Sequence, residues 1–253
     1  MGIDTKASAA RKKMVMFFLI DGSNSMNDGN KMAALNDSMA SAIEVAQDID
    51  VNNVDVQIEV AIMLFGTGSD GMQCEWLYGE PEPVNRFEWV DQVASGWTPM
   101  AKALNKLNDA MSRKKFLDTP SASVAPVVVV MSDGVPCTAG LSMEADYAET
   151  TKAIEGLKNN GWFNVAIKAA IAIGDDADKD LLAKITGTEK TVFDVHDAKR
   201  LSEVIEFIVV RSSMINSKMA NSKTGTQQEE FGNSSDEEKN VAKGNMNTSG
   251  WVE

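Results

Sequence analysis

Three almost entirely apolar runs constrain this chain of 253 residues more than any other feature. They are residues 14–20 (MVMFFLI), 124–131 (VAPVVVVM) and 164–173 (NVAIKAAIAI). A strand that is buried on both faces has this pattern, because the side chains on both sides of the pleat must be apolar. Each run is far shorter than the roughly 18 apolar residues that a membrane span requires. The runs therefore predict buried strands of a parallel sheet.

Segments with helical periodicity lie between and after these runs. Apolar residues recur every three or four positions in residues 31–48, 100–111, 143–157, 178–185 and 198–210. Residues 54–65 and 73–78 are expected to pair as a hairpin, and residues 192–195 as a short strand. This order predicts an α/β fold: a doubly wound, mostly parallel, six-stranded sheet with one antiparallel edge strand and helices on both faces.

A glycine-rich segment, GTGSDG at residues 66–71, fits the GxGxxG pattern of dinucleotide-binding loops. Such a loop must open a helix whose N-terminus faces the pyrophosphate. Here the next residues, 73–78, read as a strand. The segment is therefore interpreted as the turn of the hairpin.

The composition divides the chain into three parts. Residues 1–12 are a polar N-terminal extension, and residues 13–211 are expected to form one domain. Residues 212–253 hold few apolar residues, so we expect a low-complexity, disordered tail. Its only aromatic residues, Phe231 and Trp251, leave two interpretations open. The tail is either a passive linker or a contact element that folds on a partner or on another copy of the domain.

The formal net charge of −13 limits the partners of the protein. Nucleic acids and anionic lipids are bound by basic surfaces, so we expect neither a nucleic-acid partner nor a membrane partner. The polar N-terminus does not resemble a secretory signal. The two cysteines, Cys74 and Cys137, lie far apart and suit a reducing compartment. We therefore expect a cytoplasmic protein.

The candidate site consists of five oxygen-bearing residues in three loops: Asp21, Ser23 and Ser25 after the first apolar run, Thr98 before residues 100–111, and Asp133 after the second run. Alternate side chains of extended backbone point the same way, so the first three converge. Loops at the carboxyl ends of the strands of a doubly wound sheet form its ligand-binding edge. Carboxylate and hydroxyl oxygens suit Mg²⁺ or Mn²⁺.

A structural interpretation of the same residues stays open. Asp21 and Ser23 could cap the first helix, Thr98 could cap a later helix, and Asp133 could shape a turn.

These five residues resemble the metal-ion-dependent adhesion site of von Willebrand factor type A domains. The flanking segments FFLIDGSNSM, SGWTPMAKAL and VVVVMSDGVP also resemble that family, especially its intracellular bacterial branch associated with tellurite resistance. Asn24 departs from the glycine that many members carry there. The resemblance implies that Ser23, Ser25 and Thr98 contact the metal directly, and that Asp21 and Asp133 act largely through water. It also implies a protein partner that supplies an Asp or Glu carboxylate.

The sequence favours an interaction module over an enzyme. The alternative is a Mg²⁺-dependent hydrolase, such as a phosphatase, with Asp21 as the nucleophile. Phosphoryl transfer usually recruits a Lys or Arg, and the nearest lysines, Lys31 and Lys102, are assigned to helices outside the candidate loops. The single histidine, His196, and the lack of a nucleophile beside a base also disfavour hydrolysis.

Overall fold

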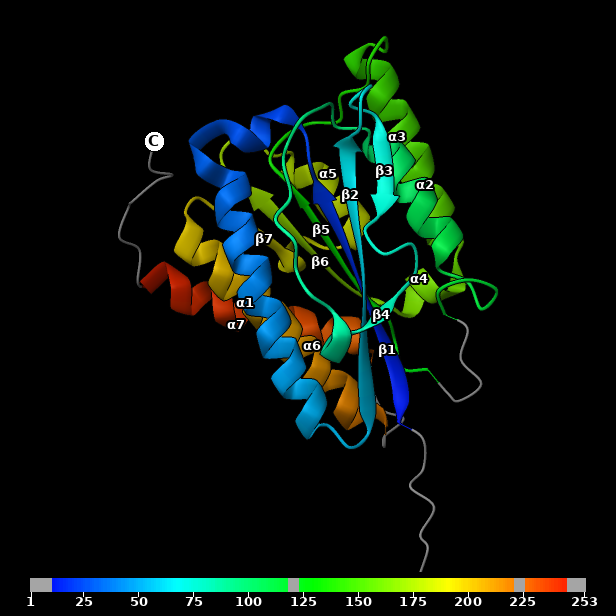
Figure 1. Cartoon of the computed structure of the whole chain (residues 1–253), viewed down its shortest axis with the longest axis vertical. Coiled ribbons are helices and arrows are strands. Elements are labelled where there is room, and N and C mark those ends of the chain that lie inside the picture. Colours follow the sequence, from blue (N-terminus) through cyan, green and yellow to red (C-terminus); the bar gives the residue numbers. More distant parts are fainter. Residues whose placement is uncertain (1–10, 118–122, 221–225, 245–253) are drawn as a thin grey trace, which may run out of the picture.

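The computed structural model describes residues 11–117, 123–220 and 226–244. Within them, seven strands form one sheet: β1 (Lys12–Asp21), β2 (Val56–Thr67), β3 (Gln73–Trp76), β4 (Glu82–Pro83), β5 (Val127–Ser132), β6 (Ile167–Ile173) and β7 (Val192–Val195). The strand order is β3-β2-β1-β5-β6-β7, and β4 also pairs with β2. Strands β2, β1, β5, β6 and β7 are parallel (Figure 1). The predicted doubly wound α/β fold is confirmed.

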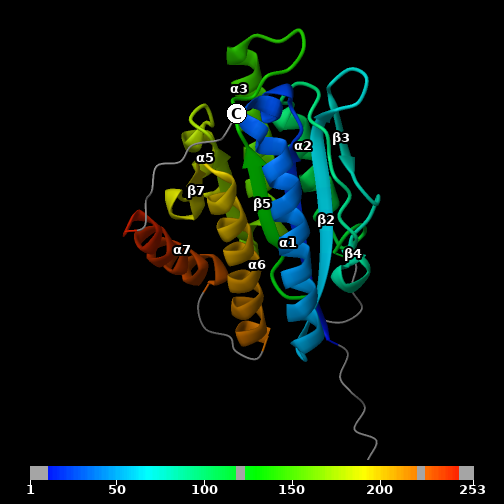
Figure 2. The same cartoon turned by 60° about the vertical axis from the view of Figure 1, so that its left-hand side comes forward.

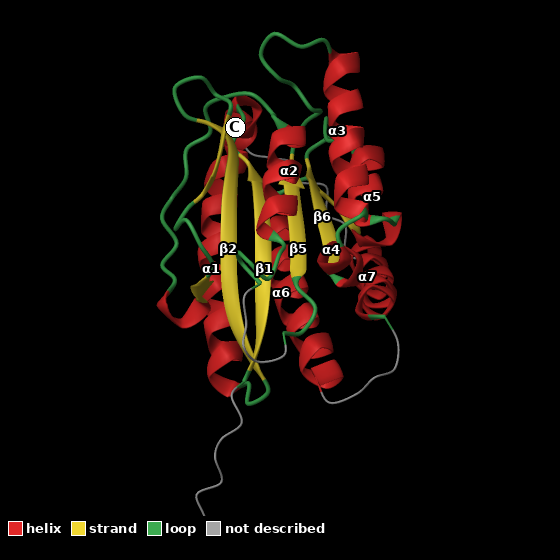
Figure 3. Ribbon diagram, turned by 90° about the vertical axis from the view of Figure 1, so that its right-hand side faces the viewer, coloured by secondary structure: helices red, strands yellow, loops and turns green. Residues whose placement is uncertain are grey.

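Helices cover both faces of this sheet. Their bounds are α1 (Lys31–Asn52), α2 (Met100–Ala110), α3 (Met143–Lys158), α4 (Gly161–Val165), α5 (Lys179–Thr186), α6 (Ala198–Ala220) and α7 (Gln227–Gly244), with 3-10 segments η1 (Asn24–Asn30), η2 (Val84–Arg86) and η3 (Glu189–Thr191). Helices α1 and α6 pack on one face, and α2, α3 and α5 pack on the other (Figure 3). Within the described ranges, no helix is long and apolar enough to cross a membrane.

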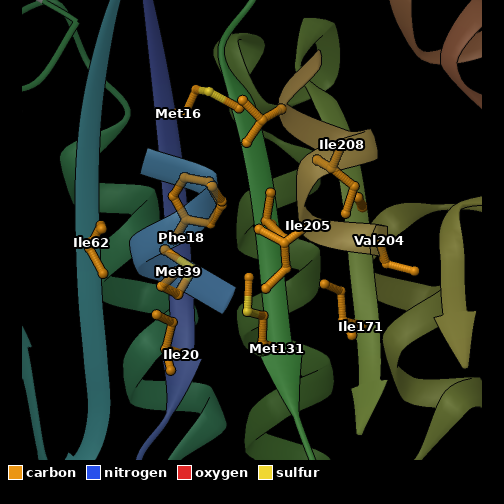
Figure 4. Close-up of a cluster of buried hydrophobic side chains, with 14 of the residues drawn as sticks. Met16, Phe18, Ile20, Met39, Ile62, Met131, Ile171, Val204, Ile205 and Ile208 are labelled. Atoms are coloured by element: carbon orange, nitrogen blue, oxygen red, sulfur yellow. The ribbon is translucent and has the colours of Figure 1, made fainter. Parts of the chain in front are cut away.

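The apolar run of β1 contacts both helical layers. Phe18 lies with Met39 of α1 and Ile205 of α6 in one buried cluster (Figure 4). Phe17 and Leu19 belong to the cluster on the opposite face. Burying a large apolar side chain contributes about 1.5–3 kcal/mol. The central strand is therefore apolar on both faces because each face stabilises a separate layer.

The antiparallel part of the sheet is larger than predicted. Strands β2 and β3 form the expected hairpin, with an irregularity in their pairing between Phe65 and Thr67. Residues 68–72 connect them without a helix, as the hairpin interpretation of the glycine-rich segment predicts. Strand β4 is a second antiparallel strand on β2, and it makes the sheet seven-stranded. Two residues carry no periodicity, so the sequence pattern could not indicate β4.

The expectation of a disordered tail is wrong for residues 212–220 and 226–244. Helix α6 continues to Ala220, and α7 packs beside α6 near the β7 edge of the sheet (Figure 2). Phe231 of α7 is fully buried, and its ring centroid lies 6.0 Å from that of Phe207 in α6. Trp251 lies outside the described residues.

Polar contacts complete the docking of α7. The side-chain amide of Gln228 donates to the carbonyl of Lys168 (3.1 Å) and accepts from its N–H (2.6 Å). This exchange satisfies backbone groups of β6 beyond the part that pairs with β7. Arg200 of α6 donates through both terminal nitrogens to Glu238 (2.5 and 2.7 Å). One buried aromatic side chain and several specific polar contacts thus order a helix of low apolar content.

Val129→Asp, in the middle of β5, is expected to prevent folding. Val129 is fully buried, and an unpaired carboxylate in the interior is strongly destabilising. Val54→Asp is the matched control, because Val54 is 82% exposed. Thermal melts followed by circular dichroism compare the two variants. A soluble Val129→Asp protein with a wild-type melt would contradict the placement of β5.

Phe231→Ala is expected to weaken the docking of α7 by about 3 kcal/mol, the usual effect of truncating a buried phenylalanine. Amide hydrogen exchange across residues 226–244 measures this loss. Glu237→Ala changes an exposed residue of the same helix and should leave the exchange rates unchanged. Equal protection of α7 in the wild type and in Phe231→Ala would refute the role of Phe231 as an anchor.

Candidate metal centre

The candidate centre lies at the carboxyl ends of β1 and β5. Ile20 and Met131 are paired in the parallel register, so the residues that follow them, Asp21 and Ser132, lie side by side. The chain runs from β1 to β2 on one side, whereas β5 lies on the other side of β1. This position is the switch point where doubly wound sheets bind ligands.

Four of the five predicted residues form one hydrogen-bonded cluster. Asp21 Oδ1 accepts from the backbone N–H of Ser23 (2.9 Å). The Oγ atoms of Ser23 and Ser25 lie 3.0 Å apart, and Ser25 Oγ donates to Asp133 Oδ1 (2.8 Å). Asp21, Ser23 and Asp133 are buried, whereas Ser25 is partly exposed. The cluster therefore reaches the protein surface at Ser25.

Thr98, the fifth predicted residue, is linked to the cluster through the backbone. It exchanges two backbone hydrogen bonds (2.8 and 3.1 Å) with Cys137, in the loop that follows β5. Two residues earlier, the carbonyl of Gly96 accepts from the N–H of Asn24 (2.9 Å). Gly96 also packs against the end of β2. Only glycine fits at position 96, because a Cβ there would lie 2.0 Å from the carbonyl oxygen of Gly66. The fold thus brings the three predicted loops together.

Helix capping does not account for these side chains. Helix α1 begins after Asn30 and α2 begins after Pro99, and neither residue makes a side-chain capping hydrogen bond. Ser23 precedes η1 and also makes no such bond. Gly29 and Asn30, with φ values of 60° and 59°, separate the serines from α1. The serine hydroxyls are therefore not used as helix caps.

Two further residues contact the cluster, and neither is among the five residues predicted from the sequence. Ser132 Oγ donates to Asp21 Oδ2 (2.6 Å), and Lys31 Nζ donates to Asp133 Oδ2 (2.8 Å). Lys31 does begin a helix, as predicted, but its ammonium group reaches the centre. The sequence contains one signal for this role: the helix dipole disfavours a positive charge in the first turn of a helix, so a lysine there indicates a compensating anion nearby.

Burial raises the pKa of the Asp21 carboxyl from 3.8 to about 7. Loss of solvent is the largest cause, and the nearby charge of Asp133 adds to it. Hydrogen bonds from Ser132 and Ser23 act in the opposite direction. A carboxylate held in this way gains from a cation, because positive charge replaces the lost hydration.

The oxygen atoms fit a small divalent cation. Adjacent ligands of an octahedral Mg²⁺ ion lie about 2.9 Å apart, since its bonds to oxygen are about 2.0–2.1 Å long. The Oγ atoms of Ser23 and Ser25, the two serines expected to contact the metal directly, have this spacing, at 3.0 Å. No group of three His, Cys, Asp or Glu side chains suited to a metal occurs in the described part of the chain. Hydroxyls would therefore supply ligands, which favours a hard cation.

The fold and the centre define a class of protein: a doubly wound α/β domain with a carboxylate–hydroxyl centre at its switch point. The family model of the von Willebrand factor type A domain matches residues 16–207. The chain belongs to this family.

Known proteins agree with this assignment. Over 217 residues the chain is 30% identical to the mouse (Mus musculus) collagen alpha-6(VI) chain, a match that covers 81% of this chain and 8% of the collagen chain. The fold is similar to a von Willebrand factor type A structure from Catenulispora acidiphila (TM-score 0.55, 19% identity, 80% of this chain and 43% of that chain). It is also similar to the pilus adhesin SpaC of Lactobacillus rhamnosus GG (TM-score 0.61, 13% identity, 82% and 31%). The chain thus spans less than half the length of each of these proteins.

The affinity for Mn²⁺ is expected to fall as the pH falls below about 7. The folded, metal-free protein then holds a proton on Asp21 that the cation must displace. Displacement of one proton lowers the affinity about tenfold per pH unit. Calorimetry between pH 5 and pH 8 measures this slope, and an affinity that is constant over this range would contradict the raised pKa.

The pH dependence of the folding stability without metal tests the same pKa shift independently. The pKa of Asp21 is higher in the folded state than in the unfolded state, so protonation stabilises the fold. That stabilisation is complete below pH 3.8 and is lost as the pH rises through about 7. In EDTA, Asp21→Asn, which carries no charge here at any pH, should therefore gain stability relative to the wild type as the pH rises from 5 to 8.

Proposed function

We propose that this domain is a metal-dependent protein-interaction module that binds an Asp or Glu carboxylate of a partner through a bound Mg²⁺ or Mn²⁺. One observation carries the proposal. Ser25 Oγ lies 3.0 Å from Ser23 Oγ and 2.8 Å from Asp133 Oδ1 at the switch point, and Asp21, whose carboxylate is buried, belongs to the same cluster. Oxygens gathered in this way suit a shared cation.

The residues of the centre have distinct expected roles. Ser23, Ser25 and Thr98 would hold the cation directly, and Asp21 and Asp133 would act largely through water, as the family resemblance implies. A bound cation supplies a Lewis acid whose charge is only partly neutralised, because hydroxyl ligands are neutral. The chain's own contribution is to hold these oxygens in place through the hydrogen bonds of Ser132 and Lys31.

The contacts of Asp21 argue against the alternative, a hydrolase with Asp21 as the nucleophile. Asp21 is fully buried, and each of its carboxylate oxygens accepts a hydrogen bond, one from Ser23 and one from Ser132. A nucleophile must reach its substrate. Lys31, the lysine of the centre, donates to Asp133 and has a side chain that is only 11% exposed. The proposal is therefore binding rather than catalysis.

The charge and the flanking segments suggest the cellular setting. The net charge of −13 supports a protein partner rather than nucleic acid or an anionic membrane. The resemblance of the flanking segments to the tellurite-resistance branch supports a cytoplasmic role in a multiprotein assembly. Within the described part of the tail, α7 docks on its own domain. We therefore do not propose α7 as a partner-binding segment.

Asp21→Ala is expected to abolish the binding of Mn²⁺ and leave the fold intact, because Asp21 lies at the carboxyl end of β1 and belongs to neither apolar cluster. Calorimetry with Mn²⁺ measures this loss. Asp175→Ala is the matched control, since the side chain of Asp175 is 93% exposed. Equal Mn²⁺ affinity in the wild type and in Asp21→Ala would sink the proposal.

The same variants test carboxylate binding. Partner proteins captured from native cells by the immobilised wild type in Mg²⁺ should be released by EDTA. They should be retained by Asp175→Ala and absent with Asp21→Ala. Capture that is insensitive to EDTA would show that the partner does not bind through a metal.

A further inference from the structure

Lys31 is a buried lysine in an electrostatically unfavourable place. It is the first residue of α1, where the helix dipole disfavours a positive charge, and the first turn of α1 contains no acidic residue. Its side chain is 11% exposed, and that of its partner Asp133 is fully buried. The 2.8 Å ion pair with Asp133 compensates the charge of Lys31.

Two residues with an unusual backbone conformation directly precede Lys31. Gly29 and Asn30 both have left-handed conformations, and Asn30 is the only non-glycine residue with a positive φ in the described ranges. A left-handed conformation is uncommon for residues other than glycine. The chain thus adopts a strained turn directly before the lysine that contacts the centre.

Asp133 connects Lys31 to the metal centre. Its Oδ1 accepts from Ser25, and its Oδ2 accepts from Lys31. One carboxylate therefore lies between a hydroxyl of the centre and a fixed ammonium group. A cation bound at the hydroxyl would share the charge of Asp133 with Lys31.

We infer that Lys31 is a positioning residue that serves as a resident counter-ion of the metal centre. It keeps Asp133 in place when the metal is absent, and it weakens the binding of the metal because its charge repels the cation. The same charge leaves the metal-loaded centre more positive toward an incoming carboxylate. This inference rests on the proposed metal-dependent function.

The direction of the effect separates this role from a merely structural one. Damage to the centre would make it bind metal more weakly. Loss of a competing positive charge would make it bind metal more tightly, because Lys31 and a cation at Ser25 would share one buried carboxylate, where charges interact strongly. We expect Lys31→Met to bind Mn²⁺ about tenfold more tightly than the wild type.

The test is Mn²⁺ calorimetry combined with thermal melts in EDTA and in Mn²⁺. Lys31→Met should melt below the wild type in EDTA, and Mn²⁺ should close most of that gap. Lys31→Arg keeps the charge and should keep the wild-type affinity. Lys13→Met is the matched control, because it breaks an ion pair with Glu59 (2.6 Å) near the opposite end of β1. That variant should lose stability equally in EDTA and in Mn²⁺, with unchanged affinity.

The possible results are distinguishable. If the wild type binds Mn²⁺ and Lys31→Met binds it with equal or lower affinity, the inference is overturned and the proposed function stands. If the wild type binds no Mn²⁺, the proposed function fails and the inference fails with it. If Lys31→Met does not fold, Lys31→Gln, which still donates a hydrogen bond to Asp133, must show the same tighter binding.

Discussion

Two carboxylates, Asp21 and Asp133, are buried near the carboxyl ends of the neighbouring strands β1 and β5, and the surrounding structure compensates their charge. Burial of an ionised carboxylate is costly unless hydrogen bonds and positive charges replace its hydration. Asp21 accepts hydrogen bonds from Ser23 and Ser132, and loss of solvent nevertheless raises its pKa to about 7. Asp133 has a hydroxyl and an ammonium group as partners. The two aspartates thus differ in how much they gain from an added cation.

The core determines that these two residues meet. Both follow apolar strands that are buried between two helical layers, and parallel pairing of β1 with β5 aligns their carboxyl ends. A shift of one residue in this register would turn the apolar side chains of β1 toward the wrong layer. Packing of the sheet therefore also fixes the relative positions of the strand ends that carry the two carboxylates. The glycines at positions 66 and 96 let the loop that carries Thr98 pack closely against the end of β2.

Much of this arrangement could be predicted from the sequence, because the relevant signals are local. Continuous apolar runs indicated the parallel strands, and three polar loops after or between predicted elements indicated the centre. The strand β4 has only two residues, which is too short for any periodic pattern. Lys31 has one local signal, its place in the first turn of a helix, but its contact with Asp133, 102 residues further along the chain, depends on the tertiary fold. The low apolar content of residues 212–253 could not predict α7. This helix is held by one buried phenylalanine and a few specific polar pairs, which an average over the segment does not reveal.

The charges of the centre explain how such an acidic protein could bind a carboxylate at all. With both aspartates ionised, the two carboxylates and the ammonium group of Lys31 carry a net charge of −1, and a divalent cation changes this to +1. The remaining surface charge acts over a Debye length of about 8–10 Å at physiological ionic strength. In the proposed function, a partner carboxylate would therefore be repelled by the protein at a distance and attracted only at contact with a metal-loaded centre. This combination would favour a partner that presents a single carboxylate on a neutral or basic surface, and it would disfavour a polyacidic segment.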